Sequence, residues 1–248
     1  MIKIIYCCGM HSSGTSLTSN YLAQCCNVKM MGTAPIDFLG EDKKFRIISH
    51  KILKDSRVHR YDKNEFDHKK LTPTQRTLDM MQNQIVSNLG TIRDNDWGWK
   101  APINSLCIWN WIPLLRNSTN GNHEIRILLV FRHPAEVVKS FMRRKSHKDR
   151  AFMAKQGGEP FDNLENVWSN YYQSVLDFHE QSKELPFTVV YSRDMIQKPE
   201  LLTNALGLKQ VPIDGVIDKS RFKLERKMVF RTKRAEKIWD ELMEKRVK

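Results

Sequence analysis

The first 26 residues constrain the fold more tightly than any other part of the chain. Residues 2–8 are β-branched or otherwise mostly apolar, as expected of a strand that is buried on both faces. Gly9 follows this run, and the pattern over residues 15–26 suits a helix. A buried strand, a glycine turn and a helix in direct succession predict the start of a parallel α/β sheet.

A second unit of this kind lies in the middle of the chain. Residues 124–132 read as another buried strand, which ends at a His-Pro pair, and helical periodicity resumes over residues 135–144. A further short strand is predicted at residues 187–191. Amphipathic helices are expected over residues 42–53, 73–89 and 164–179. We therefore predict one α/β domain over residues 1–248, with a central parallel sheet of about four or five strands flanked by helices.

The composition is that of a soluble globular protein. Its 248 residues, 40% of them hydrophobic and 28% charged, are enough to bury a large core. No apolar run reaches the ~18 residues that cross a bilayer, so we expect no membrane span. The cysteines fit neither a disulfide framework nor a CxxC metal site, and we interpret them as reduced core thiols of a cytoplasmic protein. They are Cys7, Cys8, Cys25, Cys26 and Cys107.

The chain is strongly basic, with 41 Lys and Arg against 28 Asp and Glu, which gives a net charge of +13. Such a charge attracts nucleic acid, anionic lipid or a small polyanionic ligand. The basic run at residues 143–150 has no interleaved aromatic residues and no nucleic-acid recognition motif, so we expect no nucleic-acid partner. The basic residues of 231–248 are expected to decorate a solvated surface.

The turn at residues 9–16, Gly-Met-His-Ser-Ser-Gly-Thr-Ser, predicts an anion site. Between a strand and a helix, successive backbone N–H groups and the helix dipole attract anions. Ser13, Thr15 and Ser16 add hydroxyl donors, and Gly14 allows a close backbone approach. Thr15 stands where an ATP- or GTP-binding P-loop has its lysine, which argues against nucleotide hydrolysis. The alternative is an ordinary capped helix after a tight turn.

Two other segments place cationic residues at or near the ends of expected strands. Arg132 ends the strand at 124–132, and Ser140 lies two turns into the following helix. Ligands of open α/β sheets gather at this end of the strands, and a guanidinium can bind phosphate in a bidentate manner. Lys100 belongs to an aromatic run, Trp-Gly-Trp-Lys-Ala-Pro. The alternatives are a strand-capping arginine with a neutral helical serine, and a surface lysine.

Together these segments resemble the sulfotransferases that use 3'-phosphoadenosine 5'-phosphosulfate (PAPS). The turn is similar to their 5'-phosphosulfate loop, which has a Ser-Gly-Thr-Ser or Ser-Gly-Thr-Thr core. The segment Arg-His-Pro-Ala-Glu-Val-Val-Lys-Ser resembles their 3'-phosphate site. The resemblance extends in order from Gly9 to Leu208 and implies a P-loop-NTPase-like sulfotransferase fold. The donor-binding residues that it implies are Ser12, Ser13, Gly14, Thr15, Ser16, Arg132 and Ser140.

The resemblance also implies catalytic roles. Trp-Gly-Trp-Lys-Ala-Pro is similar to the Trp-Gly-x-Lys-Asp-Pro segment of the family, whose lysine reaches the reacting sulfate, so Lys100 would stabilise the leaving oxygen. Glu41 falls where related bacterial enzymes have a Gly-x-x-Glu element, which implies that it is the general base. An acid in the first turn of a helix is the alternative for Glu41. His50 and His68 are rival bases, although neither lies in a recognised motif.

Ser12 departs from the family pattern, because this position is usually Arg or Lys and neutralises the transferring group. His11, Lys100 or an arginine from elsewhere would have to supply the missing charge. Otherwise the chain would bind a nucleotide without efficient transfer. A noncatalytic nucleotide- or polyanion-binding protein of the same fold is therefore the alternative function.

The sequence thus predicts a PAPS-dependent sulfotransferase that needs no metal. It would transfer a sulfuryl group to a hydroxyl or amine by direct in-line displacement, with 3'-phosphoadenosine 5'-phosphate (PAP) as the other product. The acceptor pocket is expected from residues of about 30–75 and 143–165, which are polar and basic. They suit a sugar, an acidic glycan or another small hydroxylated molecule equally well, and the sequence predicts no oligomeric state.

Overall fold

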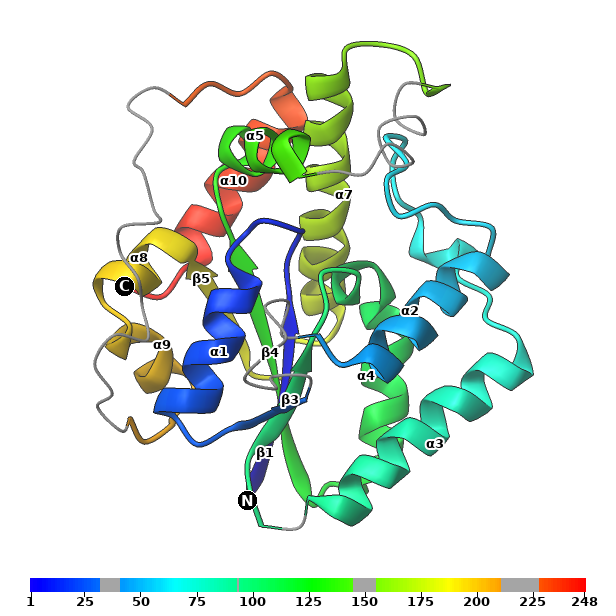
Figure 1. The fold of residues 1–248 in the computed structure, drawn as a ribbon, viewed down its shortest axis with the longest axis vertical. Coiled ribbons are helices and arrows are strands. Elements are labelled where there is room, and N and C mark those ends of the chain that lie inside the picture. Colours follow the sequence, from blue (N-terminus) through cyan, green and yellow to red (C-terminus); the bar gives the residue numbers. More distant parts are fainter. Residues whose placement is uncertain (32–40, 93, 145–154, 211–227) are drawn as a thin grey trace.

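Five strands form one parallel sheet in the order β2-β3-β1-β4-β5 in the computed structural model, which describes residues 1–31, 41–92, 94–144, 155–210 and 228–248 (Figure 1). The strands are β1 Ile2–Cys8, β2 Lys29–Met31, β3 Trp97–Lys100, β4 His123–Phe131 and β5 Phe187–Tyr191. The three strands predicted from apolar runs are confirmed, with the second shifted by one residue. The parallel α/β class and the predicted size of the sheet are also confirmed.

β1 lies at the centre of the sheet, which explains its apolar sequence. It pairs with β3 on one side, where Cys7 is opposite Lys100, and with β4 on the other, where Cys8 is opposite Leu129. Its residues from Ile4 onward are fully buried. Because all strand pairs are parallel, the carboxyl ends of the strands lie at one edge of the sheet.

Helices cover both faces of the sheet (Figure 1). On one face lie α1, α8 and α9, and on the other lie α2, α3, α4 and α7, with α5 and α10 near the carboxyl edge. Their bounds are α1 Thr15–Cys25, α2 Lys43–Asp55, α3 Gln75–Thr91, α4 Asn104–Thr119, α5 Pro134–Arg144, α7 Pro160–Gln181, α8 Ser192–Gln197, α9 Glu200–Ala205 and α10 Lys233–Lys245, with a 3₁₀ turn, η1, at His68–Lys70. The five predicted helices are confirmed to within a few residues at each end.

Alternate residues of β1 point into two separate hydrophobic cores. Ile4, Tyr6 and Cys8 point into the larger core, against α4 and α7. Ile5 and Cys7 point into the smaller core, against α1. This division follows from the two-residue period of a strand. Each fully buried large apolar side chain contributes roughly 1.5–3 kcal/mol, so β1 stabilises both layers at once.

An aromatic cluster fixes α2 against β3, and this contact matters for the site. The Phe45 ring of α2 stacks on the Trp99 ring of β3, with centroids 4.3 Å apart. Trp111 of α4 donates its indole N–H to Ser49 Oγ of α2 at 2.9 Å. Phe45, Trp99 and Trp111 are fully buried. The start of α2 is therefore held beside the carboxyl end of β3.

The basic C-terminal segment, residues 231–248, contributes to the core as well as to the solvated surface. α10 buries Ala235, Ile238 and Leu242, while its lysines point outward, so it is an amphipathic helix. After it, the Val247 N–H donates to the Val189 carbonyl oxygen of β5 at 3.0 Å. All five cysteines are buried free thiols, as predicted for core residues. Of the helices in the described ranges, none combines the length and apolar content that a bilayer crossing requires.

Candidate active site

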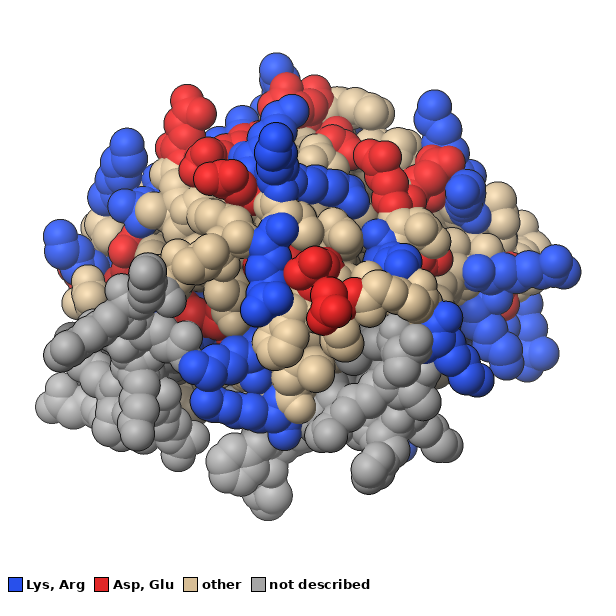
Figure 2. All heavy atoms as spheres, turned by 90° about the horizontal axis from the view of Figure 1, so that it is seen from above, with Lys and Arg blue, Asp and Glu red and all other residues tan. Residues whose placement is uncertain are grey.

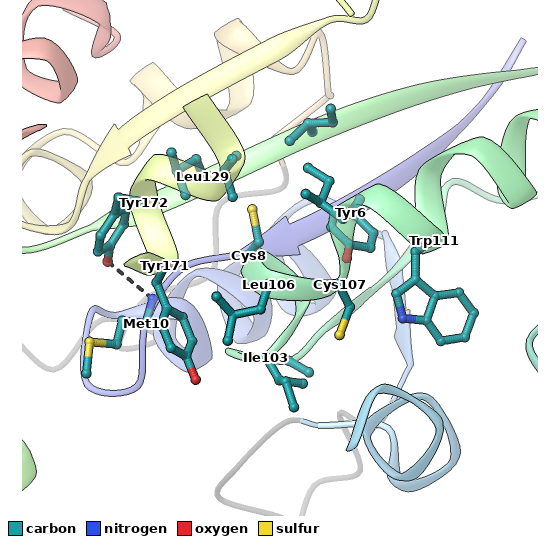
Figure 3. Close-up of a cluster of buried hydrophobic side chains, with 14 of the residues drawn as sticks. Tyr6, Cys8, Met10, Ile103, Leu106, Cys107, Trp111, Leu129, Tyr171 and Tyr172 are labelled. Carbon is teal, nitrogen blue, oxygen red and sulfur yellow. Dashed lines mark hydrogen bonds between the residues drawn. The ribbon is translucent and has the colours of Figure 1, made fainter. Parts of the chain in front are cut away.

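The turn after β1 is fixed by hydrogen bonds from its own backbone. Gly9 donates its N–H to Ser105 Oγ at 2.9 Å, and Met10 donates to the Tyr172 hydroxyl at 3.2 Å (Figure 3). The same Tyr172 hydroxyl donates to the Val130 carbonyl oxygen of β4 at 3.2 Å. Tyr172 therefore ties the turn to the end of the neighbouring strand.

Glycine is required where the turn touches the ends of β4 and β5. Gly9 has φ 142°, and a Cβ there would lie 2.2 Å from the Val130 carbonyl oxygen. Gly14 has φ 101°, and a Cβ there would lie 2.9 Å from Ser192 Cβ at the start of α8. Ser12 also adopts a left-handed conformation, with φ 69°. The turn thus packs closely where β1, β4 and β5 end.

The next residues of the turn, from Ser13 onward, lead into the first turn of α1, which lies at this edge of the sheet. Ser13 is fully buried, and its hydroxyl and its N–H both donate to the Met10 carbonyl oxygen, at 2.6 and 3.2 Å, so it shapes the turn. Thr15 is buried at the first position of α1. Among the described residues no side chain caps this helix. Gly14 caps the helix without a side-chain hydrogen bond, so the first-turn N–H groups are of the kind that bind anions.

Lys100 connects this turn to a carboxylate. It is 1% exposed, so the surface-lysine alternative is wrong. Its Nζ donates to Ser16 Oγ at 3.0 Å and lies 3.4 Å from Glu41 Oε1. On the other side of the carboxylate, Arg46 NH1 lies 3.5 Å from Glu41 Oε2. A buried ammonium group is costly unless it is paired, and here it has both a hydroxyl and a carboxylate partner.

Glu41 precedes α2 and does not belong to its first turn. Asp42 caps this helix by accepting a hydrogen bond from the Phe45 N–H at 2.9 Å, and the helix begins at Lys43. The alternative of a first-turn acid is therefore wrong. Glu41 is instead turned toward Lys100, and its side chain is only 9% exposed.

A second cluster follows β4. Arg132 lies between β4 and α5, and its guanidinium donates to both oxygens of Glu136, from Nε at 3.0 Å and from NH2 at 3.4 Å. Arg193, at the start of α8, donates to the same carboxylate at 2.6 Å. Ser140 is half-buried and lies one helical turn beyond Glu136 on the same face of α5. Two guanidinium groups and a hydroxyl therefore lie together at this edge.

Arg193 belongs to this cluster, and the sequence analysis did not single it out. The segment Val-Val-Tyr-Ser-Arg-Asp-Met follows a predicted strand, and an arginine directly after a parallel strand is placed at the ligand-binding edge. That position was a usable signal.

The histidines have different surroundings. His133, inside the second cluster, is buried between the rings of Phe230 and Trp239, with centroids 4.5 and 4.8 Å away, and its Nδ1 accepts the Ala135 N–H at 3.2 Å. Burial lowers the pKa of His133 to about 4, so the ring is neutral at physiological pH. His68 of η1 stacks on Trp109 of α4, with ring centroids 3.6 Å apart.

A cavity of about 410 Å³ opens beside Glu41. The sequence-predicted residues that it brings together are Glu41, His11 and the rival base His50. Lys100 reaches Glu41 from the buried side, so Ser16, Lys100, Glu41 and the cavity form one continuous unit. Figure 2 shows the molecule from above, and acidic side chains lie among the basic ones over the described surface. Among the described residues, no group of three or more His, Cys, Asp and Glu could hold a metal ion.

Two solved structures resemble the fold over nearly its whole length. One is the sulfotransferase domain from the curacin biosynthetic pathway, which is 14% identical, covers 98% of each chain and superposes with a TM-score of 0.52. The other is the sulfotransferase domain from the Synechococcus PCC 7002 olefin synthase, with 14% identity, 97% of this chain and 94% of that chain covered, and a TM-score of 0.53. The chain has a sulfotransferase fold. By sequence, no family model and no curated protein matches it.

The fold that the sequence resemblance implied is therefore confirmed. In this sulfotransferase fold the turn after β1, the end of β3 and the end of β4 lie at one edge of the sheet, because β1 pairs with both other strands. The turn at residues 9–16 is 80 or more residues from the segments of Lys100 and Arg132 in sequence, yet the topology makes all three neighbours. The hydrogen bond from Lys100 to Ser16, for example, joins two residues that are 84 positions apart in the sequence.

Proposed function

We propose that this chain is a sulfotransferase that takes the sulfuryl group of PAPS and passes it to a hydroxyl or amine of a small acceptor. The observation that carries the proposal is the buried Lys100, which contacts Ser16 at the anion-binding turn and Glu41 at the cavity. Transfer of a charged group between two oxygens is accelerated by a fixed cation near the leaving oxygen and a base near the attacking one. The sulfotransferase fold supports the same reaction class.

The residues present fit the two phosphate-bearing ends of PAPS. The first turn of α1, from Gly14 to Ser16, would hold the 5'-phosphosulfate with backbone N–H groups and hydroxyls. Arg132 and Ser140 would hold the 3'-phosphate, with Arg193 as a second guanidinium beside them. These donors match phosphate in both geometry and charge.

In the proposed step the acceptor oxygen attacks sulfur while the bond from sulfur to the 5'-phosphate oxygen breaks. The acceptor proton passes to the carboxylate of Glu41. The leaving phosphate oxygen keeps the electron pair of the broken bond, and Lys100 stabilises its charge. The products are a sulfate ester and PAP, so the step balances without another reactant.

Lys100 also accounts for the departure at Ser12. Ser12 lies where related sequences usually have Arg or Lys, and Lys100 contacts the same turn through Ser16. We therefore assign to Lys100 the positive charge that Ser12 does not supply. His11 lines the cavity next to Glu41 and would contact the acceptor.

One observation favours the second candidate function, a noncatalytic nucleotide- or polyanion-binding protein. Glu41 is contacted by two cations, Lys100 and Arg46, and must weaken both contacts when it accepts a proton. A carboxylate used only to hold Lys100 in place would be arranged in the same way. The two functions differ in whether the protein transfers the sulfuryl group of PAPS to an acceptor.

The test is transfer of ³⁵S from labelled PAPS to a mixed panel of hydroxyl and amine acceptors, followed by chromatography. The proposal predicts a labelled product and stoichiometric PAP with the wild type. Glu41→Gln, which keeps the shape of the side chain, should lower the rate by about 10²–10⁴-fold. PAP binding without any labelled product would favour the noncatalytic function, whereas equal transfer rates in wild type and Glu41→Gln would remove Glu41 as the general base.

A further inference from the structure

The hydroxyl of Tyr171 is a buried donor that the fold leaves without an acceptor. Tyr171 lies on α7 and is fully buried. Among the residues that the structure describes, no group forms a hydrogen bond with its hydroxyl. A hydroxyl taken out of water without a partner costs stability, because the hydrogen bonds that it made to water are not replaced. Phenylalanine would fill the same space without this cost.

The adjacent Tyr172 shows what a structural tyrosine does in this core. Its hydroxyl donates to the Val130 carbonyl oxygen and accepts from the Met10 N–H, both at 3.2 Å. The Tyr171 ring leaves α7 beside it, but its hydroxyl points away from the strands, to the side on which Ile103 lies (Figure 3). Ile103 lines the cavity of about 410 Å³. The unpaired hydroxyl therefore points toward the side of the core that borders this cavity.

Two charged residues of the cavity lining act on the same hydroxyl. Glu41 and Arg60 both line the cavity, and both interact electrostatically with Tyr171. Burial, the largest effect, holds the pKa of Tyr171 well above its ordinary value. The phenol therefore keeps its proton at physiological pH and can donate it to a hydrogen bond. A protonated donor and the carboxylate that would take the acceptor proton thus belong to one site.

This combination of groups suits one kind of attacking atom. A hydroxyl oxygen has one proton and two lone pairs. It can give its proton to Glu41, attack sulfur with one lone pair and accept the Tyr171 hydrogen on the other. A neutral amine nitrogen has a single lone pair, which the attack on sulfur uses, and an ammonium group has none. A donor at this place therefore favours oxygen over nitrogen.

We propose that the acceptor is a hydroxyl compound and not an amine, and that the Tyr171 hydroxyl donates a hydrogen bond to its attacking oxygen. This inference rests on the proposed sulfotransferase function and narrows its acceptor class. The acceptor oxygen bonds to sulfur as the bond from sulfur to the 5'-phosphate oxygen breaks. The acceptor proton passes to Glu41, and Tyr171 keeps its own proton throughout. Tyr171 is then an acceptor-binding residue that orients the attacking oxygen.

The test offers ³⁵S-labelled PAPS to matched pairs of acceptors. The pairs are phenol and aniline, benzyl alcohol and benzylamine, cyclohexanol and cyclohexylamine, and methyl glucoside and its 6-amino-6-deoxy analogue, with mass spectrometry to distinguish sulfate esters from sulfamates. We expect sulfate esters to form at least about tenfold faster than sulfamates, the effect of one buried hydrogen bond. Aniline is uncharged at neutral pH, so it separates the effect of the lone pairs from that of an ammonium charge. Sulfamates formed at comparable rates would overturn the inference and leave the proposed function intact, whereas PAP binding with no labelled compound would overturn both.

Tyrosine variants locate the effect. Tyr171→Phe should lower kcat/KM for the best hydroxyl compound at least about tenfold, with the larger part in KM, and leave the affinity for PAP within about twofold of wild type. Its urea midpoint should not fall, because the substitution removes an unpaired hydroxyl, whereas Tyr172→Phe loses two hydrogen bonds and should unfold at lower urea.

Tyr21→Phe is the matched control. Tyr21 of α1 also has a buried hydroxyl with no hydrogen-bond partner in the described part of the chain, but it belongs to the smaller core. Its kcat/KM should stay within about twofold of wild type. An unchanged kcat/KM in Tyr171→Phe, or a fall in its urea midpoint like that of Tyr172→Phe, would contradict the assignment of Tyr171 to the acceptor.

Discussion

Lys100 Nζ lies 3.4 Å from Glu41 Oε1, and the lysine side chain is almost completely buried. The two residues come from the end of β3 and the segment before α2, which the stacked pair Phe45 and Trp99 holds together. Such a pair is fixed by the core and not by surface contacts. We therefore expect its geometry to change little when a ligand binds.

Lys100→Met keeps most of the side-chain length and removes the charge. We expect kcat in the ³⁵S-transfer assay to fall by about 10²–10³-fold, because one charge-stabilising contact to the leaving oxygen is lost. The affinity for PAP should change much less. Lys245→Met is the control, since Lys245 of α10 lies at the surface, 3.6 Å from Glu180 of α7 and 3.8 Å from Glu241. A Lys100→Met enzyme with kcat within twofold of wild type would remove Lys100 from the mechanism.

Arg193→Ala tests whether the second guanidinium belongs to the donor site. It shares the Glu136 carboxylate with Arg132, and we expect its removal to weaken PAP binding by about tenfold, the effect of one charge-assisted hydrogen bond. Adenosine 5'-phosphate lacks the 3'-phosphate, so its affinity should be unchanged. Equal losses for both nucleotides, measured by calorimetry, would instead indicate a general loss of structure.

Gly9→Ala tests the close approach of the turn to β4. An added Cβ would lie 2.2 Å from the Val130 carbonyl oxygen, at a φ of 142° that side chains rarely adopt. We expect the free energy of unfolding in urea to fall by about 3 kcal/mol or more. Gly90→Ala in α3 meets no atom within 4 Å and should stabilise the protein by about 0.5–1 kcal/mol. Similar effects of the two substitutions would show that the turn adjusts freely.

His133 makes stability depend on pH. Burial lowers the pKa of His133 from 6.5 to about 4, so above pH 6.5 neither the folded nor the unfolded state is protonated there. As the pH falls from 6.5 to 4, the unfolded state gains a proton that the folded state does not, and the folded state loses up to roughly 3 kcal/mol. His133→Asn keeps an acceptor for the Ala135 N–H and cannot titrate. Urea unfolding at pH 7, 5.5 and 4.5 should give a shallower decline for His133→Asn, and parallel curves would contradict this account.

The sequence predicted the fold well where the periodicity was strong. Buried strands such as Ile2–Cys8 are continuous apolar runs, and the amphipathic helices α2, α3 and α7 show a clear apolar stripe. α4 was missed because it has no distinct apolar stripe. Residues on most of its faces are buried, and the helix contains a proline, Pro113. β2 was missed because three residues are too few to show any period.

Some residues of the candidate site could be predicted from the sequence, and others could not. Motif spacing identified Ser16, Lys100 and Arg132, but only the sheet topology shows that the first two touch across 84 residues. Arg46 and Arg60 have no motif around them, and their place on the cavity follows from the packing of α2 and the segment after it. The burial of Ser13 likewise depends on three-dimensional contacts that no local pattern encodes.

The most direct test of the account is calorimetric titration of the purified protein with PAP, comparing wild type with Arg132→Ala. Arg116→Ala, which removes an arginine from an exposed ion pair with Glu184, is the control for the change in net charge. The account predicts tight binding by wild type and the control, and loss of binding by at least tenfold in Arg132→Ala. Failure of the wild type to bind PAP at low salt would contradict the donor site and with it the proposed sulfotransferase function.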